Sequence, residues 1–219
     1  MTKGATGLPR IGAVLMAAGA GRRMRHRPKC LLLRDGEPLL VHSLRMLAAA
    51  GLSQVVVVLG HHAEPIAAVL EQCRSAADVS TAVQWTVNPN PDAGTASSLH
   101  CGLAALPAGL DGILVTLADQ PLITADDIRT VLAAWHTRPP GTQLLIPRFQ
   151  GNPRHPLLFA TALRHTLMAE SMGVREWRKT RPETVSWLDV NHPRHTLDVD
   201  TEADLAQLAA EHGVQLHHG

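Results

Sequence analysis

Residues 11–24, with the sequence IGAVLMAAGAGRRM, decide the fold of this chain. The run from Ile11 to Ala17 is short and apolar, which favours a β-strand. The glycines and arginines after it predict a turn in which backbone N–H groups can approach an anion closely. The stretch therefore predicts a strand that carries an anion-binding turn at its carboxyl end.

Apolar runs and helical segments alternate in the same way along most of the chain. Continuous runs such as Val55 to Leu59 suit strands that are buried on both faces, as parallel strands are. We therefore expect an α/β fold with a Rossmann-like, doubly wound, mostly parallel sheet. Strands are predicted over Ile11 to Ala17, Gln54 to Leu59, Val83 to Val87, Gly112 to Leu117 and Leu144 to Pro147, and helices over Leu39 to Ala50, Glu64 to Ala77, Thr95 to Leu106, Thr124 to His136, Ala160 to Met172 and from Thr201 onwards.

One domain is expected over residues 11–212, between a flexible tail at 1–10 and a short tail at 213–219. No stretch is rich enough in Pro, Gly or Ser to mark a linker to a second domain. The first ten residues lack the apolar segment of a signal peptide, and no apolar stretch is long enough to span a bilayer. After Pro147 the alternation breaks, and a subregion that closes over one end of the sheet is expected there.

Composition narrows the possible partners and the compartment. A net charge of +1 among 219 residues gives no field that would favour nucleic acid or a membrane as the main partner. The three cysteines, Cys30, Cys73 and Cys101, are widely spaced and contain no CxxC pair that could form a zinc site. Their odd number and wide spacing fit a reducing cytoplasm. The 13 histidines are scattered, and most are expected at the surface.

The turn after the first strand is the first candidate site. It departs from the dinucleotide fingerprint at Met24 and His61, and Lys29 lacks the neighbours of a Walker A lysine. A plain turn between strand and helix remains the alternative to anion binding, and Arg22, Arg25 and Arg27 are read as solvated charges. The residues assigned to a nucleotide triphosphate here are Ala17, Ala18, Gly19 and Gly21 through the backbone, and Arg23 and Lys29 through their charge.

Carboxylates form the second candidate site. Asp119 follows an apolar run, and ligands of α/β sheets bind beyond the carboxyl ends of strands. Asp200 stands just before a predicted helix start, and with Asp119 it could hold Mg²⁺. Thr201 and Asp204 form a capping box, and Asp198 is read as a surface residue. The alternative for Asp119 is that it only organises a turn.

The third candidate is the loop from Asn88 that runs into the helix predicted from Thr95. A helix N-terminus offers unpaired N–H groups that suit a ribose, base or phosphate, and Gly94 and Ser98 are assigned to nucleotide binding. The alternative is that Thr95 or Ser97 only caps the helix.

Taken in order from Ile11 to about Leu208, these motifs resemble the nucleotidyltransferases of molybdenum cofactor biosynthesis, especially the cytidylyltransferases. The resemblance implies a GT-A-like fold in which residues 17–24 wrap the nucleotide. Arg23 and Lys29 would then lie on its phosphates as catalytic residues, with Asp119 and Asp200 on Mg²⁺. The implied reaction moves CMP from CTP onto the phosphate of the molybdenum cofactor and releases pyrophosphate.

Departures from the family pattern bear on both substrates. Ala18 stands where the guanylyltransferase branch has glycine, which favours CTP over GTP. Residues 151–156 resemble a Gly-x-x-Gly-His-Pro motif that would face the acceptor, but Arg154 replaces its second glycine. Arg25 likewise stands where the family often has glycine. His155 is assigned to the acceptor, with a purely structural place in the turn as the alternative.

Other functions remain open at this point. The acceptor could be a sugar phosphate or a phosphorylated alcohol. An oxidoreductase role is disfavoured by the broken dinucleotide fingerprint. A chaperone that binds the finished cofactor and delivers it to a molybdoenzyme is the alternative without catalysis.

Overall fold

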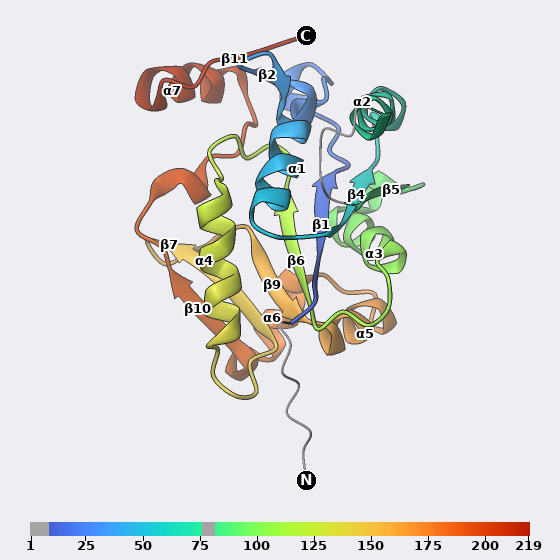
Figure 1. Ribbon diagram of the computed structural model, residues 1–219, viewed down its shortest axis with the longest axis vertical. Helices are drawn as coiled ribbons and strands as arrows, with labels where there is room; N and C mark the ends of the chain where they lie inside the picture. The colour runs from blue at the N-terminus through green and yellow to red at the C-terminus, as the bar shows by residue number, and fades with distance from the viewer. Residues whose placement is uncertain (1–8, 76–81) are drawn as a thin grey trace.

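A mixed sheet forms the centre of the protein, which a computed structural model describes over residues 9–75 and 82–219. Figure 1 shows β1, β6 and β4 side by side at its middle. The eight strands are β1 (Ile11–Ala17), β4 (Gln54–Leu59), β5 (Ala82–Val87), β6 (Gly112–Leu117), β7 (Leu144–Phe149), β8 (Asn152–Pro153), β9 (Leu157–Ala160) and β10 (Val185–Asp189).

The strand order is β10-β7-β9-β6-β1-β4-β5, with β8 paired to β7. β1 pairs in parallel with β4 and with β6, β4 with β5, and β10 with β7. β9 runs antiparallel between β6 and β7. The expected doubly wound, mostly parallel α/β sheet is therefore confirmed, and all the predicted strands are present.

Three strands of this sheet were not predicted: the two-residue β8 and the longer β9 and β10. β9 is only four residues long, and its last residue, Ala160, was predicted as the start of a helix. β10 lies at the edge of the sheet, where none of its side chains is buried and Trp187 is 41% exposed. A half-exposed edge strand lacks the continuous apolar run that identifies a central parallel strand.

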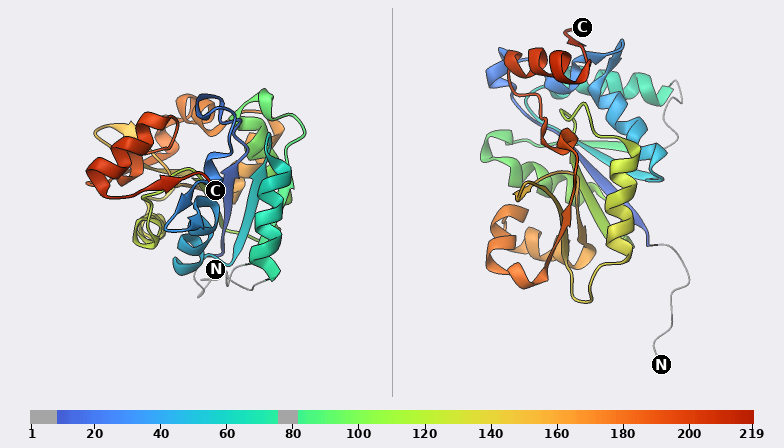
Figure 2. Two further views of the ribbon diagram at one scale, coloured as in Figure 1. Left: turned by 90° about the horizontal axis from the view of Figure 1, so that it is seen from above. Right: turned by 90° about the vertical axis from the view of Figure 1, so that its left-hand side faces the viewer.

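Helices cover both faces of the sheet. The right-hand view of Figure 2 shows α1 and α4 on one face and α3 and α5 on the other. Side chains alternate along each strand, so Leu15 of β1 packs on one face and Val14 on the other. The helices are α1 (Leu39–Ala49), α2 (Ala63–Ser75), α3 (Thr95–Ala105), α4 (Ala125–His136), α5 (Thr161–Ala169), α6 (Val174–Thr180) and α7 (Glu202–His212).

Most helix predictions are confirmed with small shifts at their ends. Ala77, the predicted end of α2, lies outside the described residues. Ala160 belongs to β9, and α5 begins after it. Thr124 and Thr201 are the N-caps of α4 and α7, and each makes a full capping box, which confirms the structural role given to Asp204.

A third apolar cluster lies beyond the carboxyl ends of the central strands. A small sheet of β2 (Leu33–Arg34), β3 (Glu37–Pro38) and β11 (Leu216–His217) covers it together with α7, at the top of Figure 1. Residues 213–219, expected as a tail, thus contribute a paired strand, whereas residues 1–8 lie outside the described part. The third cluster consists of Met24, Leu32, Leu39, Leu122, Val199, Leu208 and Leu216.

None of the described helices is both long and apolar enough to cross a membrane.

Candidate functional site

A cleft of about 600 Å³ opens beyond the carboxyl ends of β1 and β6. This is the place where ligands bind in open α/β sheets. Ala17 differs from the other assigned residues because it is buried in the core and borders a smaller cavity below the cleft. The predicted residues that line the large cleft are Ala18, Gly19, Gly21, Arg23, Lys29, Gly94, Ser98, Asp119 and Asp200.

Gly21 determines the shape of the turn after β1. Its φ is +58°, and a Cβ atom there would lie 2.0 Å from the carbonyl oxygen of Arg27. The carbonyl of Gly21 also accepts hydrogen bonds from the amides of Met24 and His26, at 2.8 and 2.9 Å. A side chain at this position would collide with the main chain of its own turn, so the turn requires glycine.

The two arginines that replace family glycines differ in their backbone. Arg25 has a φ of +54°, in the left-handed region where glycine is favoured. Arg154 does not have a positive φ, and its amide donates to the carbonyl of Pro147 at 2.7 Å. The turn before β9 therefore accommodates arginine without left-handed backbone at that residue.

Lys29 joins the two carboxylates that the sequence assigns to a metal. Its Nζ lies 2.6 Å from Oδ2 of Asp119 and 2.8 Å from Oδ1 of Asp200. Arg23 Nη2 lies 2.5 Å from Oδ2 of Asp200. Burial by itself lowers the pKa of Lys29, but the two carboxylates outweigh burial and raise it. The cations expected on phosphates and the carboxylates expected on a metal are thus paired with each other.

Asp198 belongs to this site, which corrects its assignment to the surface. It lines the cleft, and Nε2 of Gln120 donates to its Oδ1 at 2.7 Å. Desolvation by the cleft walls and the nearby charge of Asp119 raise the pKa of Asp198 to about 6. Residues two apart in an extended segment point the same way, so its spacing from Asp200 was a usable signal.

Within residues 9–75 and 82–219, no three His, Cys, Asp or Glu side chains are close enough together to enclose a metal ion. Asp119, Asp198 and Asp200 nevertheless line one cleft. Carboxylate oxygens are the donors that Mg²⁺ and Mn²⁺ prefer. The residues present fit a divalent cation that also takes ligands from a substrate.

The loop before α3 leaves the helix N-terminus open to the cleft. The N-cap is Gly94, and no side chain caps the helix, so neither Thr95 nor Ser97 has the capping role considered for it. Nδ2 of Asn88 donates instead to the hydroxyls of Ser97 and Ser98, at 2.8 and 2.9 Å. The first-turn N–H groups of α3 can therefore bind a ligand.

An ion pair that the sequence did not predict spans the mouth of the cleft. Arg22, read as a solvated charge, has Nη2 2.7 Å from Oδ1 of Asp92. His61 Nε2 lies 3.3 Å from the same oxygen. This cluster joins the loops after β1 and β4 to the loop before α3.

His155 is tied into its turn. Its Nδ1 donates to the carbonyl of Val115 on β6 at 3.4 Å, and burial lowers the pKa of its imidazole. The carbonyl of His155 accepts a hydrogen bond from Nδ1 of His195 at 2.9 Å. His195 is only 3% exposed and is an exception to the expectation that most histidines lie at the surface.

Comparison with known proteins shows that solved structures share this fold. A crystal structure of Rv0371c from Mycobacterium tuberculosis H37Rv superposes with a TM-score of 0.73 at 26% identity and covers 93% of this chain and 99% of that one. A complex of the same protein with manganese has a TM-score of 0.67 at 24% identity, over 92% and 99%. CMP:2-keto-3-deoxy-manno-octonic acid synthetase complexed with CTP shares the fold, with a TM-score of 0.66, 16% identity, and coverage of 92% and 97%.

Among curated relatives, the bifunctional protein GlmU of Mycobacterium sp. strain KMS is 37% identical over 135 residues, which are 61% of this chain and 27% of GlmU. The chain therefore spans about a quarter of the length of that relative. The model of the MobA-like NTP transferase domain matches residues 13–185. Because that match takes in the glycine-rich turn, Lys29, Asp119 and most of the chain, the protein belongs to the MobA-like NTP transferase family of nucleotidyltransferases.

Proposed function

We propose that this protein transfers CMP from CTP to the phosphate of the molybdenum cofactor and releases pyrophosphate. One observation carries the proposal: Arg23 and Lys29 meet Asp119 and Asp200 in one cleft beside the glycine-requiring turn. The two cations can bind the phosphates of a substrate, and the two carboxylates can bind the metal ion that accompanies those phosphates. The resemblance of the motifs to cytidylyltransferases of molybdenum cofactor biosynthesis supports the acceptor.

The triphosphate is assigned to the turn after β1 and to the N-terminus of α3. Gly19 leaves room for phosphate oxygens near backbone N–H groups, Gly21 permits the turn that holds these groups, and Gly94 opens the helix end. Arg23 and Lys29 turn from the carboxylates to the phosphates and offset charge on the departing pyrophosphate. The acceptor's phosphate is already an anion, so its attack on the α-phosphorus requires no general base.

A divalent cation, Mg²⁺ in our proposal, is assigned to Asp119 and Asp200. The complex of Rv0371c with manganese supports a cation in this fold. When bound, such an ion polarises phosphoryl oxygens and holds the triphosphate in one orientation. The protein's own part is to hold the two carboxylates close together and to release them from Lys29.

The acceptor is assigned to the side of Asp119 that faces β9. β1 and its turn flank β6 on one side, and β9 flanks it on the other. The register pairs Val115 with Leu157, so His155 lies near the carboxyl end of β6, which Asp119 follows. An acceptor beside His155 therefore approaches from the side opposite the nucleotide turn.

The choice of CTP rests on Ala18, a residue that lines the cleft and carries a methyl group where a glycine would leave more room for a purine. The CTP complex of the octonic acid synthetase supports a cytidine nucleotide in this fold. Arg154 in the acceptor turn favours a second candidate, the same transfer to a phosphorylated sugar or alcohol. The name of the synthetase pairs CMP with a sugar acid, which supports an acceptor of this kind on the fold.

The test is pyrophosphate release by the purified protein with Mg²⁺, comparing CTP, GTP, ATP and UTP with the molybdenum cofactor or a sugar 1-phosphate. Release with CTP and the cofactor alone is expected. Release only with the sugar phosphate would replace the acceptor, and no release at all would favour cofactor delivery without catalysis.

Asp119→Asn should lower pyrophosphate release by at least about a hundredfold, because it removes one of the paired carboxylates. Asp126→Asn is the matched control, since the Asp126 side chain is 85% exposed on α4 and bonds only Arg129 among the described ion pairs. Normal release by Asp119→Asn would reject the assignment of this carboxylate.

A further inference from the structure

A buried histidine joins the turn before β9 to the start of α4, on the side of β6 to which the acceptor is assigned. His195 lies in the 3₁₀ turn Pro193–Thr196 and is 3% exposed. Its Nδ1 donates to the carbonyl of His155 at 2.9 Å, and its Nε2 lies 3.5 Å from Oδ1 of Asp127. The two ring nitrogens therefore connect the turn before β9 to the first turn of α4.

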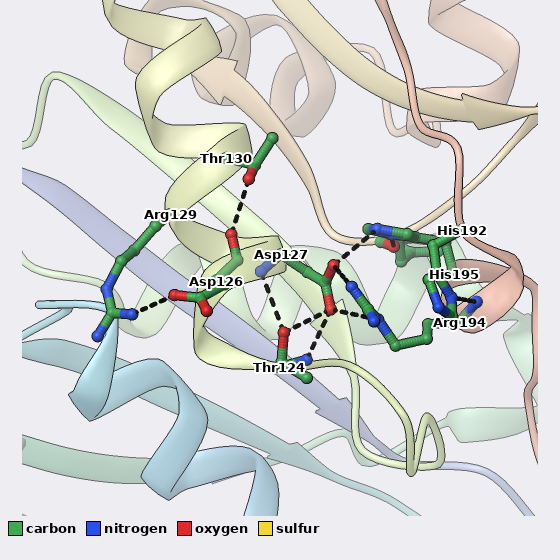
Figure 3. A network of polar contacts seen from close by, with 9 residues as sticks. Thr124, Asp126, Asp127, Arg129, Thr130, His192, Arg194 and His195 are labelled. Atoms are coloured by element: carbon green, nitrogen blue, oxygen red, sulfur yellow. Dashed lines mark hydrogen bonds and ion pairs between the residues drawn. The ribbon is translucent and has the colours of Figure 1, made fainter. Parts of the chain in front are cut away.

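Asp127 is a rigid anchor for this histidine. Figure 3 shows its carboxylate between Thr124 on one side and Arg194 and His195 on the other. Thr124 donates to Oδ2 through its amide at 2.9 Å and its hydroxyl at 2.7 Å. Arg194 donates through Nη2 at 2.9 Å and Nε at 3.2 Å. The contact on Nε2 therefore connects His195 to a carboxylate that Thr124 and Arg194 already hold at the start of α4.

The bond on Nδ1 has a different consequence. The His155 peptide stands near the end of β6, where its own ring is oriented by Val115. A residue whose side chain and carbonyl are both hydrogen-bonded has little freedom to rotate. The bond from His195 thus limits rotation of the His155 main chain, while Val115 orients its ring.

We infer that His195 is a positioning residue for the acceptor, because its Nδ1–H holds the His155 peptide in place while its Nε2 contact with Asp127 serves stability. This inference rests on the proposed function, in which His155 meets the acceptor. It assigns separate tasks to the two nitrogens of one buried ring.

Two isosteric substitutions separate these tasks. The amide nitrogen of asparagine reaches about as far as Nδ1, so His195→Asn keeps a donor for the His155 carbonyl and loses the contact with Asp127. The amide nitrogen of glutamine reaches about as far as Nε2, so His195→Gln keeps the Asp127 contact and loses the bond to His155. A purely structural histidine would show activity that follows the melting temperature in both variants.

The variants are compared in acceptor KM with the molybdenum cofactor, in Kd for CTP, in melting temperature, and in amide exchange over residues 150–158. His195→Gln should raise acceptor KM about tenfold, the loss of about one hydrogen bond, with CTP affinity unchanged within about twofold. Exchange over residues 150–158 should speed up with it. His195→Asn should keep KM within about threefold although it melts at a lower temperature.

Loss of acceptor affinity in His195→Asn equal to that in His195→Gln would overturn the inference, as would a KM that follows the melting temperature. If His195→Gln does not fold, the folded His195→Asn variant decides by its KM alone. The exchange comparison needs no acceptor. A wild-type protein without pyrophosphate release would therefore reject the proposed function, while faster exchange in His195→Gln than in His195→Asn would still support the positioning role.

Discussion

Replacing Lys29 by methionine should change metal and nucleotide affinity in opposite directions. In the structure the ammonium group occupies the space between Asp119 and Asp200, at 2.6 and 2.8 Å from their oxygens. A divalent cation that binds without nucleotide must displace this group. A nucleotide triphosphate, in contrast, needs the same group as a counterion. Lys29→Met therefore frees the carboxylates and removes a phosphate ligand in one step.

The magnitude follows from the contacts that are lost. The side chain of Lys29 is 16% exposed, whereas that of Asp200 is 39% exposed, so solvent screens part of the pairing. A hydrogen bond between charged groups is worth about 1.5–3 kcal/mol, and we take the lower end for this half-open cleft. About 1.5 kcal/mol corresponds to roughly a tenfold change in a dissociation constant.

The assay is calorimetric titration of Mn²⁺ into nucleotide-free protein, and of CTP into metal-free protein. Lys29→Met should bind Mn²⁺ about tenfold more tightly and CTP about tenfold more weakly than the wild type. Lys179→Met, an exposed lysine on α6, controls for the loss of one positive charge. Weaker binding of Mn²⁺ by Lys29→Met would refute the reasoning, because it would mean that Lys29 does not compete with the cation.

Two further predictions concern the turn and the buried anchor. Gly21→Ala should weaken CTP binding at least tenfold, because left-handed backbone costs about 1–2 kcal/mol and the added Cβ would meet the Arg27 carbonyl at 2.0 Å; unchanged affinity in calorimetry would contradict it. Burial raises the pKa of Asp127, but hydrogen bonds from His195, Arg194 and Thr124 lower it overall. The unfolded chain then binds the proton more readily, so stability is retained above about pH 4 and lost as the pH falls further. Asp127→Asn should flatten this loss in urea unfolding between pH 6 and 3, and an unchanged slope would contradict the assignment.

Sequence reasoning located the central strands because their apolar runs are local and continuous. Val55 to Leu59 is buried along its whole length, as such a run requires. The glycine-rich turn and Asp119 could be found for the same reason, since each directly follows one of these strands. β10 was missed because its exposed Trp187 and polar neighbours mark an edge, and edge strands lack that signal.

Contacts between distant segments could not be predicted. Asp92 meets Arg22 from 70 positions away, and His195 meets His155 from 40 positions away. No local pattern encodes these pairs, because they depend on how the loops pack beyond the sheet. The pairing of Lys29 with Asp200, 171 positions apart, likewise follows from the fold and not from the spacing of either motif.

The third apolar cluster includes two chain neighbours of the site residues. Met24 follows Arg23, and Val199 separates Asp198 from Asp200 and donates its amide to the carbonyl of Asp119 at 3.0 Å. This cluster is separate from the two that pack against the sheet, so it can open while the sheet stays folded. On heating, the protein should therefore lose activity below its melting temperature. Activity that is lost between these two temperatures should return on cooling.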